Sequence, residues 1–221
     1  MNKDIQVIRA KRKTISLHVR EDASVVLYAP YEVADRYIEE FIQRHNVWIQ
    51  KKKGLMIKRL TEEPYHRFED GEKLLYLGNL YRLNRKDFNS PVWNGDSFNV
   101  LKGSDIDVAS ILIEWYREAA LKVITQRVKL FTSINELKYR CVKISSANRK
   151  WGSCSVQGDL RFSWKLVMAP LPVIDYVVAH ELAHLKVRNH SKVFWKQVGL
   201  LKPDYKTNRA WLNENGHMLK L

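Results

Sequence analysis

The stretch from Ile174 to His190 reads IDYVVAHELAHLKVRNH and predicts a helix. Proline is tolerated in a first helical turn, so the helix is expected to run from near Pro172 to about Val187. Apolar residues at three- and four-residue steps give it a stripe suited to core packing: Ile174, Val178, Leu182 and Leu185. The pattern therefore predicts a helix that packs one face against a core and leaves another face available for functional side chains.

Two histidines lie on the face that the apolar stripe does not use. His180 and His184 are four residues apart, so a helix places them one above the other, about 40° apart around its axis. Two imidazoles so placed can bind one tetrahedral zinc ion. Glu181 follows the first histidine and points beside the metal, where it can take a proton from a water activated by the zinc. The spacing predicts one zinc ion per chain, with Glu181 as general base.

A catalytic zinc usually has three protein ligands, and His190 is the expected third. Asn189 could end the helix in a left-handed conformation, after which the chain could turn His190 back to the metal. The alternative is that His190 only caps the next helix, which is expected over residues 191–200 with Ser191 as its N-cap. Two carboxylates could compete as third ligand: Asp204 and Glu214.

The C-terminal half around this helix predicts a mixed α+β unit. A long helix is expected over about residues 106–130. Strands are expected over residues 141–145, 151–155 and 160–164, with a turn at Gly158. Together these elements would form a small, mostly antiparallel sheet that packs with the long helix and the histidine helix.

The N-terminal half predicts a smaller lobe of hairpins and one helix. Hairpins are expected over residues 15–29 and 69–83, and a helix over residues 33–53. Residues 84–103 are rich in Asn, Asp, Gly and Ser, which is typical of a linker or a long surface hairpin. The expected domains are an N-terminal lobe, residues 1–103, and a catalytic domain, residues 104–221.

The chain is strongly basic. Its 221 residues include 38 Lys and Arg against 24 Asp and Glu, a net charge of +14. Basic runs occur at residues 11–13, 51–53 and 149–150. Such a surface raises the rate of encounter with polyanions, so nucleic acid is a candidate partner; the alternative is that these side chains are merely solvated.

The composition also bears on the compartment. Two cysteines, Cys141 and Cys154, cannot form a framework of several disulfides. The first residues lack the apolar run of a signal peptide, and the most apolar stretch, residues 166–179, is interrupted by Pro170 and Pro172 and is too short to span a bilayer. We therefore expect a cytoplasmic monomer without a membrane segment.

Several blocks of the sequence resemble the YgjP-like metallopeptidases, a family similar to the SprT-like and minigluzincin groups. The specific ones are RKWGSCS at residues 149–155, IDYVVAHELAHL at 174–185 and NHS at 189–191, with Phe194 and Trp195 after them. Weaker ones, KTISL at residues 13–17 and WIQKK at 48–52, extend the resemblance over nearly the whole chain.

The resemblance implies a zincin-like catalytic unit. In it, His180, His184 and His190 match the zinc ligands, and Glu181 matches the catalytic glutamate. The strand over residues 151–155 would form the rim of the cleft, where an extended substrate pairs by strand addition. The candidate substrate-binding residues are Arg149, Trp151, Gly152, Ser153 and Tyr176. Of these, Trp151 either walls the cleft or packs in the core, and Cys154 is expected to pack near the cleft.

Hydrolysis of a peptide bond is the predicted reaction, and a peptide or protein is the expected substrate. Glu181 would accept the proton of water and return it to the leaving amine. A developing oxyanion needs a further donor, for which the candidates are Tyr176, Tyr205, Arg149 and Asn189.

Three other functions stay open at this point. Some members of the family are labelled nucleotide pyrophosphatases, and the positive charge suits a triphosphate, but neither a glycine-rich phosphate loop nor a carboxylate cluster for magnesium is visible. A nucleic-acid-associated peptidase acting on DNA-bound proteins also fits the charge. A structural zinc site would leave Glu181 without a role and calls for four protein ligands.

Overall fold

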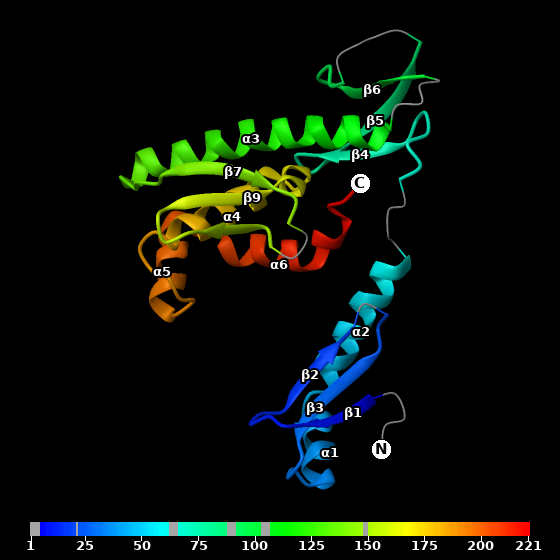
Figure 1. The fold of residues 1–221 in the computed structure, drawn as a ribbon, viewed down its shortest axis with the longest axis vertical. Helices are drawn as coiled ribbons and strands as arrows, with labels where there is room; N and C mark the ends of the chain where they lie inside the picture. Colours follow the sequence, from blue (N-terminus) through cyan, green and yellow to red (C-terminus); the bar gives the residue numbers. More distant parts are fainter. Residues whose placement is uncertain (1–4, 21, 62–65, 88–91, 103–106, 148–149) are drawn as a thin grey trace. The chain divides into compact units, whose positions relative to one another are not determined.

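The computed structural model describes the chain except for residues 1–4, 21, 62–65, 88–91, 103–106 and 148–149 (Figure 1). The chain divides into two compact units, Met1–Glu63 and Pro64–Leu221, each with a hydrophobic core of its own. Both units combine helices with three-stranded sheets, so the predicted mixed α+β class is confirmed. No helix in the described part is both long and apolar enough to cross a membrane.

The first unit contains a sheet with the strand order β1-β3-β2. Strand β1 (Ile5–Ala10) is parallel to β3 (Val25–Pro30), and β2 (Ser16–Val19) is antiparallel to β3. The predicted hairpin over residues 15–29 is therefore confirmed as β2 and β3. The central strand β3 is almost wholly buried, because Leu27 and Ala29 pack into the core of this unit.

The prediction of a single helix over residues 33–53 is wrong, because the helix is interrupted at His45. Helix α1 (Asp35–Arg44) ends there, and α2 (Asn46–Thr61) begins at the next residue. His45 caps α1 twice: its backbone N–H bonds to carbonyls of the last turn, and its ring nitrogen Nδ1 lies 2.7 Å from the carbonyl oxygen of Phe41. These capping bonds explain why the helix ends at this point, although the apolar period of the sequence continues through it.

The second unit begins with a sheet of order β4-β5-β6. Strands β4 (Lys73–Tyr76) and β5 (Asn79–Lys86) form the predicted hairpin, and β6 (Ser97–Leu101) pairs parallel to β5. The two residues of the turn, Leu77 and Gly78, both have positive φ. Their backbone N–H groups bond to the carbonyls of Val167 and Met168, so the turn is tied to the segment before the histidine helix.

The predicted domain boundary between residues 103 and 104, both outside the described residues, falls within the range of this second unit, Pro64–Leu221. The reason is packing: apolar residues of β4, β5 and β6 share one core with the C-terminal elements. The buried members from this sheet are Leu74, Leu83, Phe98 and Val100. The linker-like segment, residues 84–103, contains the end of β5 and all of β6.

A long helix and a third sheet follow in the second unit. Helix α3 (Val108–Asn135) covers the predicted helix over residues 106–130, of which residue 106 lies outside the described residues. One row of α3 at steps of four residues is fully buried: Leu112, Tyr116, Ala120, Ile124 and Val128. The third sheet has the order β7-β9-β8, from strands β7 (Cys141–Ser145), β8 (Gly152–Cys154) and β9 (Asp159–Ser163).

The prediction that this sheet is mostly antiparallel is wrong. Strands β8 and β9 form the expected antiparallel hairpin around Gly158, but β9 also pairs parallel to β7. Strand β9 inserts between β7 and β8, so β8 becomes an edge strand.

The remaining helices gather beside that edge. The short 3-10 helix η1 (Trp164–Met168) leads into α4 (Leu171–Ala183), the histidine helix, which is followed by α5 (Lys192–Leu201), α6 (Tyr205–Asn215) and the 3-10 turn η2 (Gly216–Met218). Helix α4 contacts α3, α5, α6 and β8 (Figure 1). The histidine helix is thus held between the long helix and the edge of the third sheet.

Candidate metal centre and active site

The histidine helix is almost wholly buried and is fixed by one ion pair. Asp175 on α4 accepts two hydrogen bonds from Arg127 on α3, at 2.6 and 2.8 Å. The regular helix ends at Ala183, four residues earlier than predicted, and His184 is its C-cap. His184 still has right-handed helical angles, and short turns continue to Val187, so the expected stacking of His180 and His184 is preserved.

Three imidazole rings meet at the end of this helix. The ring centroids of His180, His184 and His190 are 4.8–5.1 Å apart, and one nitrogen from each lies within 4.8 Å of the others. The Nε2 atoms of His180 and His190 are 3.0 Å apart. Nitrogen ligands of one tetrahedral zinc ion lie about 3.4 Å from each other, so this donor set fits zinc with small adjustments.

Hydrogen bonding and burial prepare these rings to bind a cation. His184 Nδ1 lies 3.0 Å from the carbonyl oxygen of Val187, which can only accept, so Nδ1 carries the proton and Nε2 keeps its lone pair. Burial, with the nearby charges of His184 and His190, lowers the pKa of His180 to about 4. Burial also lowers the pKa of His184. Neutral imidazole is the form that ligates metals.

The loop between the histidines differs from the one expected. Asn189 is not among the described residues with positive φ, so no left-handed residue ends the helix there. Its side-chain oxygen instead accepts a hydrogen bond from the backbone N–H of Ser191. Ser191 caps α5 as predicted, through the backbone N–H of Phe194. The turn nevertheless brings His190 to the other two rings.

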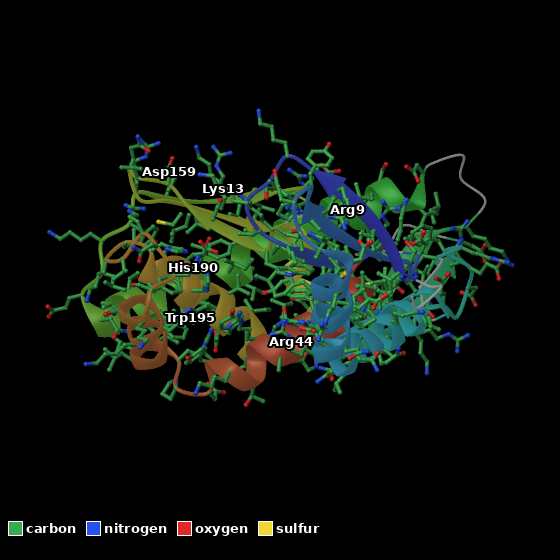
Figure 2. The ribbon with its side chains drawn as sticks, turned by 90° about the horizontal axis from the view of Figure 1, so that it is seen from below. Arg9, Lys13, Arg44, Asp159, His190 and Trp195 are labelled. Atoms are coloured by element: carbon green, nitrogen blue, oxygen red, sulfur yellow. The ribbon has the colours of Figure 1, made fainter. Side chains whose placement is uncertain are left out.

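One buried side chain touches all three histidines. The ring centroid of Phe194 lies 4.5 Å from that of His184, 4.7 Å from His190 and 4.9 Å from His180. Phe194 has no exposed surface. The neighbouring ring of Trp195 stacks on that of His190, and Figure 2 labels both residues. Phe194 therefore forms an apolar floor that fixes where the three imidazoles can lie.

Glu181 lies in a tight space next to strand β8. Only 4% of its surface is exposed. A Cβ atom added to Gly152 would come within 2.6 Å of Glu181 Oε1 and 2.7 Å of its Cγ, so the missing side chain of Gly152 is the room in which Glu181 sits. Burial raises the pKa of Glu181 to about 8, and the positive charge of Lys150 opposes that rise. A cation held by the histidines would favour the ionised carboxylate.

These groups open onto one cavity of about 450 Å³. It gathers the three histidines and Glu181 with four of the five predicted substrate-binding residues: Trp151, Gly152, Ser153 and Tyr176. The fifth, Arg149, lies outside the described residues. Trp151 lines the cavity and is also partly buried against the core, so the two alternatives are not exclusive; a Cβ on Gly216 would lie 2.9 Å from its ring.

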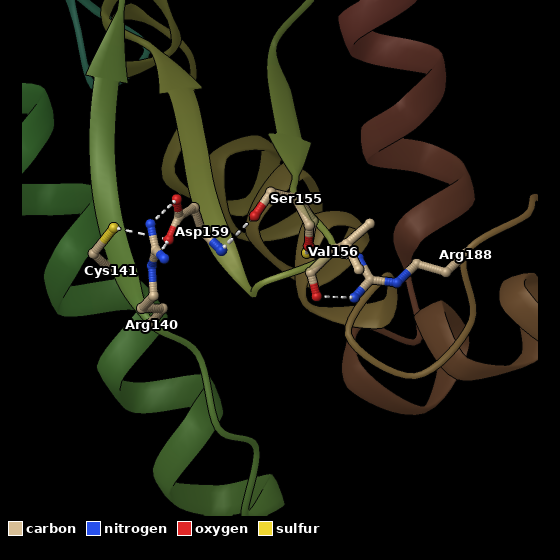
Figure 3. Close-up of polar contacts among 7 residues, drawn as sticks. Arg140, Cys141, Ser155, Val156, Asp159 and Arg188 are labelled. Atoms are coloured by element: carbon tan, nitrogen blue, oxygen red, sulfur yellow. Dashed lines mark hydrogen bonds and ion pairs between the residues drawn. The ribbon is translucent and has the colours of Figure 1, made fainter.

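The cavity also contains residues that sequence reasoning passed over. Lys150 and Arg188 line it, and so does Cys154, which was expected only near it. Arg188 donates hydrogen bonds to the carbonyl oxygens of Ser155, at 2.7 Å, and Val156, at 3.0 Å (Figure 3). Arg188 stands in the stretch Ile174–His190, four residues after His184, and that proximity was the available signal.

The two carboxylates considered as competing ligands lie elsewhere. Asp204 pairs with Lys202, whose Nζ is 2.9 Å from its nearer oxygen. Glu214 is exposed on α6. Among the described residues, the group of potential metal ligands at this site contains only the three histidines.

Comparison with known proteins places the chain in a family. Residues 13–215 match the family described as YgjP-like, metallopeptidase domain. The match covers most of the sequence, so the chain belongs to the YgjP-like metallopeptidase family.

Similarity to individual proteins is more limited. The chain is 31% identical over 67 residues to the UTP pyrophosphatase of Escherichia coli (strain K12), which covers 28% of this chain and 40% of the length of that relative. The crystal structure of the metallopeptidase zymogen of Pyrococcus abyssi abylysin matches with 21% identity and a TM-score of 0.37, over 41% of this chain and 93% of that one. The zymogen of Methanocaldococcus jannaschii jannalysin matches with 22% identity and a TM-score of 0.35, over 39% and 90%.

Proposed function

We propose that the chain is a zinc-dependent metallopeptidase in which His180, His184 and His190 bind one zinc ion and Glu181 is the general base. The observation that carries this proposal is the meeting of three imidazole nitrogens with a buried carboxylate at one cavity. Membership of a metallopeptidase family supports it.

The donor set favours zinc over the common hard cations. Magnesium and calcium prefer oxygen ligands, whereas neutral imidazole suits zinc. Three protein ligands, rather than four, are typical of a catalytic site, which keeps one position for water or substrate. A zinc ion here would lower the pKa of water and polarise a substrate carbonyl as a Lewis acid.

Two side chains would then move or hold protons. Glu181 accepts the proton of the attacking water and delivers it to the leaving amine. Tyr176 lines the cavity, and burial raises the pKa of its hydroxyl, so it stays protonated and can donate a hydrogen bond to the developing oxyanion. Tyr205 and Asn189 are weaker candidates because neither is among the described residues that line the cavity.

Strand β8 would guide the substrate. It is the edge strand of its sheet, so one row of its backbone groups has no partner strand among the described residues. An extended peptide can pair with such an edge and pass its backbone over the cavity. In this proposal Gly152 and Ser153 contact the substrate backbone, and the second unit is a zincin-like catalytic unit. A cytoplasmic location, a monomeric state and contact of the basic surface with nucleic acid stay predictions.

Metal analysis and peptide cleavage test the proposal together. Purified protein supplied with zinc is expected to retain one zinc ion per chain, and a His190→Ala variant much less. The zinc-loaded protein is expected to cleave a mixture of unstructured peptides, and a chelator should abolish cleavage. A folded protein that binds no zinc would refute the metal site. Bound zinc without cleavage of any peptide would refute the peptidase.

A second candidate function is hydrolysis of a nucleoside triphosphate to release pyrophosphate. The 67-residue similarity to UTP pyrophosphatase is the observation that favours it. The cations Lys150 and Arg188 at the cavity suit a triphosphate as well. Pyrophosphate released from UTP at a rate that depends on Glu181 would support this reading over the peptidase.

A further inference from the structure

The two cations that line the cavity stand at opposite ends of strand β8. Lys150 comes two residues before the strand begins at Gly152. Arg188 reaches the other end from the loop after α4, where it bonds to the carbonyls of Ser155 and Val156 (Figure 3). Both cations are exposed, and both line the same cavity.

Neither cation is neutralised by a carboxylate of the described residues. Other basic residues of the second unit have such partners, as Arg127 has Asp175 and Arg140 has Asp159. The hydrogen-bond acceptors of Arg188 are two neutral carbonyls and the sulfur of Cys154, which fix the direction of the guanidinium without pairing its charge with a carboxylate. Among the described residues that line the cavity, Glu181 is the one that is acidic, and it is buried and committed to the proposed chemistry.

A third cation adds to this field from α6. The guanidinium of Arg209 lies 4.5 Å from the centroid of the Trp195 ring, again without a carboxylate partner in the described part of the chain. The Trp195 ring in turn stacks on that of His190, which lines the cavity. Cations fixed in this way bind an anion with little loss of side-chain freedom.

We propose that the cavity selects peptides that carry acidic side chains on both sides of the cleaved bond, one bound by Lys150 and the other by Arg188. This inference rests on the proposed peptidase function and names its substrate class. The chain from residue 150 to residue 155, fully extended, spans at most about 17 Å. A peptide that pairs with β8 covers this span with about five residues, so its two acidic residues stand four or five positions apart.

The test uses four peptides of identical length and core sequence. One carries Asp at both outer positions, the second carries Asn there, the third carries Lys, and the fourth has both Asp residues at the same end. For the zinc-loaded protein, kcat/KM is expected to be roughly threefold to tenfold higher for the first peptide than for the second, and lowest for the third. The fourth should lose part of the advantage, and salt at about 0.5 M should remove most of it.

Four variants, the last of them a control, assign the preference to the two cations. The advantage is the ratio of kcat/KM for the Asp peptide to that for the Asn peptide. Lys150→Gln and Arg188→Gln should each lower the logarithm of this ratio by about half. Because Arg188→Gln also removes a tie to the β8–β9 turn, Arg188→Lys is made beside it and is expected to retain the acidic preference. Lys143→Gln, an exposed lysine on the far strand β7 of the same sheet, should change nothing. Equal cleavage of the Asp, Asn and Lys peptides would overturn the inference and leave the peptidase proposal standing.

Binding to the Glu181→Gln variant separates the two proposals. The zinc-loaded variant should bind the peptide with Asp at both ends more tightly than the Asn peptide, by a similar factor, whether or not the wild type cleaves peptides. Tighter binding of the Asp peptide, without cleavage of it by the wild type, would refute the proposed peptidase function and support the selection of acidic peptides. Equal affinities, or binding of UTP but of no peptide, would refute the inference.

Discussion

The cavity has two walls, and they are built in different ways. One wall belongs to helix α4, where Glu181 is buried and where Phe194 of α5 packs against the histidine rings from behind. The other is strand β8, whose residues are half-buried and whose outer edge has no partner strand in the described structure. The comparison shows a division of roles: the packed wall fixes the groups that would perform the proposed chemistry, and the open wall leaves an edge with which the proposed substrate could pair.

The largest effect is expected from a change in the packed wall that removes the proposed general base, Glu181. Glu181→Gln keeps the shape of the side chain but cannot accept a proton, so kcat for peptide cleavage should fall about 10³-fold, within the usual range for a general base. Zinc content should stay at one per chain, measured by elemental analysis. Substantial turnover in this variant would contradict the role of Glu181.

A change on the open wall should disturb the packed wall through one contact. In Gly152→Ala the new methyl group would occupy the space of the Glu181 carboxylate, 2.6 Å from Oε1. Displacing a catalytic group by about 1 Å can cost on the order of 10²-fold in kcat. The matched control is Gly54→Ala on α2, where an added Cβ meets nothing within 4 Å. Similar activity in both variants would show that Gly152 has no such role.

The apolar floor should matter for metal affinity. Phe194→Leu leaves the three imidazoles less restricted, and loss of such support typically weakens metal binding about 10- to 100-fold. Competition with a chromogenic chelator measures the zinc affinity. Phe98→Leu, at another fully buried phenylalanine remote from the histidines, should lose a similar stability, about 1–3 kcal/mol, with zinc affinity unchanged. Equal affinities in the two variants would make Phe194 an ordinary core residue.

The smallest effect is expected at the start of strand β9, which pairs with β8 of the open wall. Arg140 forms a bidentate pair with Asp159 at the start of β9, and these hydrogen bonds hold the pKa of Asp159 below its ordinary value (Figure 3). A depressed carboxyl pKa stabilises the fold above the unfolded pKa, about 3.9, and this stabilisation is lost as pH falls through the folded pKa.

Thermal unfolding of the wild type and Arg140→Gln measures this contribution. The wild type should have the higher midpoint at pH 7, and the difference should shrink below about pH 4. A difference that does not change with pH would mean that the pair acts through packing alone.

The meeting of the three histidines was predictable from the sequence because its main spacing is local. The positions of His180 and His184 follow from helix geometry over four residues, which survives even though the regular helix ends at Ala183. His190 needed only a short turn, although the turn differs from the expected one. The contact of Gly152 with Glu181 joins residues of different elements, and periodicity carries no information about such pairs.

The larger differences between the predicted and the observed fold have the same cause, which is contact between elements distant in the sequence. The insertion of β9 between β7 and β8 and the sharing of one core by β4–β6 and α3 are choices among long-range pairings. Local patterns identify strands but do not say which strands become neighbours. The break at His45 was missed because the apolar period runs through it, and the capping bonds that end α1 become visible only in three dimensions.

The four residues from Val187 to His190 each have a different partner: Val187 holds His184, Arg188 holds the end of β8, Asn189 bonds to Ser191, and His190 faces His180. Surface loops usually tolerate insertions and deletions. Here one inserted or deleted residue would shift every later partner by a place and uncouple both walls at once. The length of this loop, more than the identity of any one of its residues, is therefore what a protein engineer would have to leave untouched.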